Sequence, residues 1–149
     1  MNWFLLLKSL HVLSAIVAVG ANATYGIWSA FGKRSGTELG FALRGIKVVD
    51  DRMANPAYGV LLVTGLIMAF TTYDIVRTFI LIGLGIFFIA AVGGQLYSAT
   101  VAKQIQALDR SGAQSPEYAA LDARARGIGI FLAVVLVAVV FVMVFKPQV

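Results

Sequence analysis

The chain has 149 residues, of which 60% are hydrophobic and 13% are charged, and its formal net charge is +5. Soluble proteins carry about 25% charged residues, so this composition excludes an ordinary soluble domain and indicates an integral membrane protein. The absence of cysteine excludes disulfides, thiolate metal sites and haem attachment through Cys-x-x-Cys-His. No basic motif interleaved with aromatic residues suggests nucleic acid, so we expect the lipid bilayer to be the main partner.

Four apolar stretches are long enough to cross the hydrocarbon core as helices, which takes ~20 residues. They predict spans over about residues 3–31, 54–73, 77–102 and 127–146. The expected fold is therefore all-α, with residues 1–149 forming one domain, a four-helix transmembrane bundle with up-down topology. The first span also fits a secretory signal, because Ala21-Asn22-Ala23 is a small-x-small cleavage pattern, but we expect it to be retained.

The first span contains the only histidine of the chain, His11, on a face of polar and small residues. With 100° per residue in a helix, the residues within about 60° of His11 are Lys8, Ser14, Ala15, Ala18, Asn22, Tyr25 and Ser29. Such a face is poorly suited to lipid. Because ionisable groups at membrane depth are rare and face the bundle interior, His11 is a functional-site hypothesis.

The next two spans offer possible partners for this face. The second span follows Asn55-Pro56, which suits a helix start, and it holds Met68. The third span has a stripe of small residues that allows close helix packing, namely Gly83, Ala90, Gly94 and Ser98. Its Gln95 is expected to form a structural hydrogen-bonded pair with Asn22.

The third helix is predicted to continue past the membrane and to end near Ser111-Gly112, and Ser115-Pro116-Glu117 predicts the start of the last helix. The connection over residues 33–52 is charged, with enough apolar residues for part of it to form an interfacial helix.

The basic residues predict the orientation. Of the twelve, nine lie in the two connections on one side: Lys33, Arg34, Arg44, Lys47, Arg52, Lys103, Arg110, Arg124 and Arg126. By the positive-inside rule these connections are cytoplasmic, and both termini face outward, which in a bacterium means the periplasmic side of the inner membrane.

His11 allows several interpretations. It can be a buried neutral imidazole that bonds a backbone carbonyl or Ser14, an axial ligand of b-type haem, or part of a proton, quinone or metal site. A zinc or copper site lacks a second histidine, a cysteine and an intramembrane carboxylate. Haem needs one or two protein ligands, and the sixth ligand can be Met68 or His11 of a second copy. Lys8 is one turn away and can pair with a haem propionate or a lipid headgroup.

The segments 4–14, 64–66 and 142–147 resemble a family of bacterial integral membrane proteins described as domain of unknown function 2269, over nearly the whole chain. The most specific features are Lys8-x-x-His11 and the closing Lys146-Pro147. The resemblance extends to copper-resistance D-type and protoporphyrinogen oxidase J-type membrane proteins, helical bundles in which histidines are associated with b haem. It implies His11 as a haem ligand and Lys8 as a nearby functional cation.

The sequence therefore predicts a haem b-binding or redox-associated membrane module, with His11 on the iron and Lys8, Met68, Ser14, Ala15 and Ala18 around the cofactor. Because a single histidine excludes bis-histidine ligation within one chain, we expect a homodimer or a subunit of a larger complex. With no evident acid/base partner for His11, catalysis by the chain alone is not expected. The alternatives are a cofactor-free accessory subunit and a small-solute transporter, which lacks support from paired charges or an inverted repeat.

Overall fold

The computed structural model describes residues 2–73 and 76–146. Its helices are α1 (Trp3–Ser35), α2 (Leu39–Val49), α3 (Asn55–Thr71), α4 (Thr78–Ser111) and α5 (Pro116–Phe145), and a π-helical turn, η1 (Asp50–Ala54), joins α2 to α3. Four helical stretches are long and apolar enough to span a membrane, because α2, η1 and α3 together form one of them. The predicted all-α fold with four membrane-length helices is confirmed.

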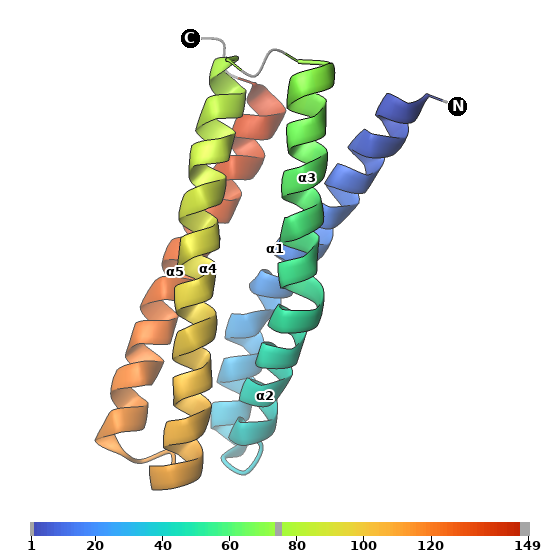
Figure 1. The fold of residues 1–149 in the computed structure, drawn as a ribbon. Helices are drawn as coiled ribbons and strands as arrows, with labels where there is room; N and C mark the ends of the chain where they lie inside the picture. The colour runs from blue at the N-terminus through green and yellow to red at the C-terminus, as the bar shows by residue number, and fades with distance from the viewer. Residues whose placement is uncertain (1, 74–75, 147–149) are drawn as a thin grey trace.

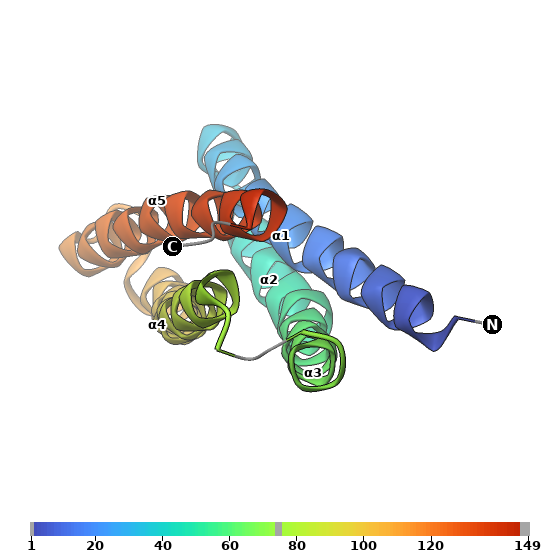
Figure 2. The same ribbon diagram turned by 90° about the horizontal axis from the view of Figure 1, so that it is seen from above.

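The helices form two antiparallel pairs. The closest contacts are between α4 and α5 and between α1 and α3, whereas α3 and α4 are scarcely in contact. The start of α1 and the end of α5 lie at the same end of the bundle, and the start of α1 stands apart from the other helices (Figures 1 and 2). We call this the terminal end, and the opposite end, with residues 36–38 and 112–115, the loop end.

The helical backbone runs unbroken from Leu39 through η1 into α3. Pro56 explains the π turn, because proline lacks an N–H and its ring clashes with the carbonyl four residues earlier. The Asn55 N–H accordingly donates to the Asp50 carbonyl, five residues back, in the wider geometry of a π turn. Helix α3 begins at Asn55 as expected, but most of residues 33–52 form helix rather than a loop.

The turn between α4 and α5 matches its prediction. Helix α4 ends at Ser111, and Gly112 has a positive φ of 80°, which a residue without Cβ adopts readily. The Ser115 side chain accepts a hydrogen bond from the Tyr118 N–H and so caps α5, whose first residue is Pro116.

Small residues on α4 allow α5 to approach closely, as the sequence predicts, although the glycines differ in part. A Cβ at Gly83 would overlap the Met143 side chain, and a Cβ at Gly93 would lie 2.7 Å from Leu132 Cδ2. Ala90 and Ser98 are buried as well. The predicted stripe included Gly94, but a Cβ at Gly94 would meet open space. The neighbouring Gly93 makes the close contact with α5 that was expected of Gly94.

The apolar core lies in the loop-end half. A cluster of buried side chains joins α1, α2, α4 and α5, including Tyr25, Leu43, Tyr97, Val101 and Leu132. Towards the terminal end many large apolar side chains of α1, α3 and α5 are exposed. Such a surface suits contact with lipid.

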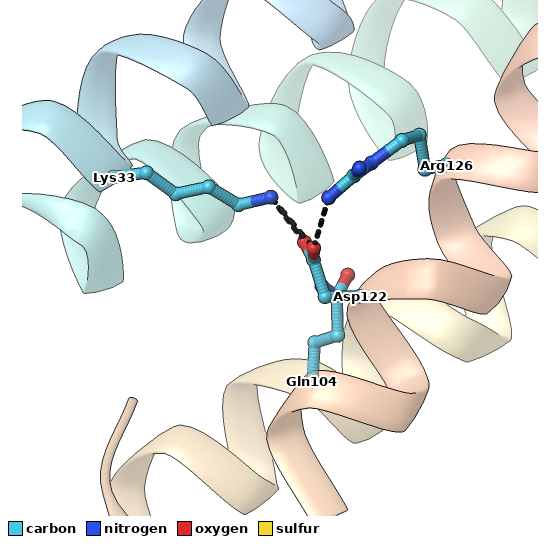
Figure 3. A network of polar contacts seen from close by, with 4 residues as sticks. All are labelled: Lys33, Gln104, Asp122 and Arg126. Atoms are coloured by element: carbon cyan, nitrogen blue, oxygen red, sulfur yellow. Dashed lines mark hydrogen bonds and ion pairs between the residues drawn. The ribbon is translucent and has the colours of Figure 1, made fainter. Parts of the chain in front are cut away.

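Near the loop end, a network of polar contacts connects α1, α4 and α5 (Figure 3). The Asp122 carboxylate on α5 accepts hydrogen bonds from Lys33 Nζ of α1 at 2.7 Å and from Arg126 at 2.8 Å. It also accepts one from Gln104 Nε2 of α4 at 3.3 Å. Gln104 is only 1% exposed, so Asp122 satisfies a buried amide as well as two cations.

We expect Asp122→Ala to lower the free energy of unfolding by about 1 to 3 kcal/mol, because it leaves the buried Gln104 amide without an acceptor. The measurement is equilibrium unfolding of the purified protein in mixed micelles. Asp109→Ala is the control, since the Arg44–Asp109 pair is half exposed on both sides and such pairs contribute at most about 1 kcal/mol. Equal losses in the two variants would contradict this role of Asp122.

Candidate functional site

Four polar residues spread along α1 have hydrogen-bond partners on other helices, whereas Lys8, near the start of α1, is exposed. From the terminal end to the loop end, His11 bonds Thr64 of α3, Asn22 bonds Tyr58 of α3, Tyr25 bonds Asp50 of η1, and Lys33 bonds Asp122 of α5. The predicted polar face of the first span is therefore an internal face. Among these side chains, Asp50 has a buried oxygen, Oδ2, without a hydrogen-bond partner.

His11 Nδ1 lies 2.9 Å from the Thr64 hydroxyl oxygen. The Thr64 hydroxyl is 2.7 Å from the Val60 carbonyl, to which it donates. Because a hydroxyl has one hydrogen to donate, Nδ1 is the donor to Thr64 and carries the proton. Nε2 is then an unprotonated acceptor. A Cβ at Gly65 would lie 3.0 Å from His11 Cε1, so a side chain at this place would push the ring away from α3 by a few tenths of an ångström.

The His11 ring also has a hydrogen bond with the Leu61 backbone, whose carbonyl lies 3.2 Å from the same Thr64 hydroxyl. Apart from Thr64 and Leu61 the ring has no hydrogen-bond partner in the described part of the chain, and Nε2 is not among its buried unpartnered atoms. It therefore reaches the molecular surface. Around it, Lys8 is exposed and Ala15 is half-buried, whereas Ser14 and Ala18 are buried. Met68, one turn after Thr64, is also buried, with 8% of its surface exposed.

Asn22 has a different partner from the one expected. Its Nδ2 donates to the Tyr58 hydroxyl at 3.0 Å and to the Ala18 carbonyl at 2.8 Å. No hydrogen bond joins Asn22 to Gln95 within residues 2–73 and 76–146, although both side chains line the same groove. The sequence predicted a hydrogen-bonded partner for Asn22, but that partner was Gln95 of the third span and not Tyr58 of the second.

Asp50 is the residue that the sequence analysis missed. It was placed in the charged connection over residues 33–52, whereas in the structure Asp50 is buried and only 7% exposed. Its Oδ1 accepts a hydrogen bond from the Tyr25 hydroxyl at 3.2 Å, and Ser98 of α4 faces the same carboxylate. Its Oδ2 is buried without any partner. The signal in the sequence was Pro56, whose π turn continues the helix and brings Asp50 inward.

Two grooves separate the helix pairs. The first, which we call the polar groove, has a volume of about 540 Å³, lies between α3 and α4, and includes Asp50, Asn22, Asn55, Tyr58 and Gln95 among apolar residues. The second lies between α1 and α5 and has a volume of about 700 Å³. Asn22 lines both. Both grooves follow from the scarce contact of α3 with α4 and of α1 with α5.

We expect Tyr25→Phe to lower the free energy of unfolding by about 1 to 3 kcal/mol, because Asp50 Oδ1 loses its donor inside the protein. Tyr118→Phe is a matched control in which the lost hydroxyl is buried and has no partner, so its stability stays the same or rises. Both are measured by unfolding in mixed micelles. A larger loss for Tyr118→Phe than for Tyr25→Phe would refute the role given to the Tyr25–Asp50 bond.

A comparison with protein families finds a match to the model described as "Predicted integral membrane protein (DUF2269)" over residues 5–147. No curated protein and no solved structure matches the chain.

Proposed function

We propose, on the premise that the chain belongs to the DUF2269 family of predicted integral membrane proteins, that it is a b-type haem-binding redox module with His11 as an axial ligand. The observation that carries the proposal is the state of the imidazole. Thr64 engages Nδ1 as a hydrogen-bond acceptor, so Nε2 has a free lone pair at the molecular surface. Histidine ligands in proteins have this arrangement, in which one ring nitrogen is held by a second group while the other binds the metal.

The residues around His11 fit a single axial ligand rather than a complete site. Met68 and Ser14 are buried, whereas Nε2 opens to the surface that lipid or another protein covers. We infer that a second copy of the chain, or another subunit, supplies the other side of the haem. Lys8 is exposed one turn from His11 and is available to a haem propionate.

A bound haem supplies one-electron chemistry, and the chain's contribution is to orient the ligand. Thr64 fixes the protonated nitrogen of His11, and Gly65 allows the ring to pack against α3. For the setting, we propose a bacterial inner membrane with both termini outside, because basic residues of the connections gather at the loop end, as Lys33, Arg44 and Arg126 do.

The test is the absorption spectrum of the detergent-purified protein, oxidised and reduced with dithionite. We expect a Soret band and reduced α and β bands in the natural protein and their complete loss in His11→Ala. Thr64→Val should weaken haem retention by about tenfold to hundredfold, because partners of a ligating histidine contribute this much to affinity.

Thr71→Val is the matched control, since Thr71 lies on the same helix and its hydroxyl only donates to the Ile67 carbonyl. It should retain haem like the natural protein. A colourless natural protein after expression with ample haem refutes the proposal.

A cofactor-free accessory subunit is the second candidate, and the His11–Thr64 hydrogen bond favours it, because this bond by itself satisfies one nitrogen of the ring. Such interhelical bonds in membranes contribute about 0.6 kcal/mol on average. In that case His11→Ala lowers stability modestly, leaves the protein colourless as before, and weakens co-purification with the partner.

A further inference from the structure

The polar groove contains a carboxyl group, that of Asp50, with one oxygen that has no hydrogen-bond partner. Asp50 is the only side chain with a formal charge among its lining residues, all of which lie in the described part of the chain. The nearest basic residue on the same helical stretch, Lys47, forms an ion pair with Asp51 and does not reach into the groove lining. A buried carboxylate without a cation is costly. The groove therefore lacks the positive group that Asp50 needs.

A second acceptor lies in the same groove. Because a carbonyl can only accept a hydrogen bond, the atom of Asn22 that bonds the Ala18 carbonyl is the amide nitrogen, Nδ2. The same nitrogen donates its other hydrogen to the Tyr58 hydroxyl. The Asn22 Oδ1 is thus left without a donor in the described structure. Asp50 Oδ2 and Asn22 Oδ1 are thus two oxygen acceptors without a donor in the described structure, and both belong to side chains that line the groove.

Aromatic rings bound the groove beside these acceptors. Tyr58 of α3 and Phe87 of α4 both line it and meet edge to face, with their ring centroids 6.3 Å apart. Aromatic faces attract cations, and most of the other lining residues, such as Leu62, Ala90 and Leu136, are apolar. The groove thus combines one carboxylate, a free amide oxygen and aromatic rings with an apolar wall.

We propose that the polar groove binds a primary ammonium group carried on an apolar body, with Asp50 Oδ2 and Asn22 Oδ1 as hydrogen-bond acceptors. An ammonium has three N–H donors and no acceptor, which matches two free oxygens better than a neutral hydroxyl does. This site is separate from the His11 surface and does not rest on haem binding. The ammonium can belong to a free long-chain amine or to a lipid with an ethanolamine headgroup.

The experiment measures binding of dansylcadaverine, a fluorescent primary amine, to the full-length protein in phosphatidylcholine nanodiscs. We expect saturable binding, and no saturable binding of the N-acetylated dansylcadaverine, which lacks the charge. Asp50→Asn should bind the amine about tenfold to hundredfold more weakly, since it loses a charged hydrogen bond. Asp51→Asn, one residue away and exposed, should bind it like the natural protein.

The proposal is overturned if the natural protein does not bind the amine saturably, if the acetylated probe binds equally well, or if Asp50→Asn binds unchanged. The comparison of the two probes uses the natural protein alone, so it stands even if a variant fails to fold. Adding phosphatidylethanolamine to the nanodiscs shows whether the natural ligand is a lipid headgroup or a free long-chain amine. Displacement of the probe assigns the site to the lipid headgroup, and no displacement assigns it to a free amine.

Discussion

The polar face of α1 is the constraint on which the rest of the bundle depends. A helix in lipid cannot leave such side chains to the hydrocarbon without a large cost. His11, Asn22, Tyr25 and Lys33 lie at intervals close to whole helical turns, so one face of α1 presents them all. Their partners lie on three elements: α3 for His11 and Asn22, η1 for Tyr25, and α5 for Lys33. These bonds set the register of α1 against the other helices.

The same constraint explains why the two helix pairs meet tightly at the loop end only. There the ion pair of Lys33 with Asp122 and the stacked rings of Tyr25 and Tyr97, 5.8 Å apart, join α1 to α5 and α4. Towards the terminal end, the contacts of α1 are with α3, through Thr64 and Gly65. Across the polar groove, α3 and α4 are joined by the Tyr58–Phe87 ring contact. The grooves are thus a consequence of where the polar bonds lie.

The sequence predicted the helices better than their partners. Hydropathy and length suffice for four membrane-length helices, and Ser115-Pro116 marks the start of α5 because capping is a local property. The inward position of Asp50 was not predictable from periodicity, because a π turn shifts the helical face by a fraction of a turn, and residues before it cannot be placed by counting 100° from those after it. Likewise, the choice of Tyr58 over Gln95 as the partner of Asn22 depends on which helix approaches α1.

The two sites both involve residues of α1, His11 in one and Asn22 in the other, but they lie at different depths in the bundle. Tyr25 bonds Asp50 and so lies at the same level in the bundle. Along α1, Tyr25 is about 21 Å from His11, at about 1.5 Å per residue. Asp50 lines the groove between α3 and α4, whereas His11 does not. A ligand at one site therefore does not touch the other. Coupling between them would have to pass through α1 and α3, whose hydrogen bonds Asn22–Tyr58 and His11–Thr64 span the interval. Asn22 lies on this path and also lines the groove, so it is the residue through which occupancy of the groove could reach His11.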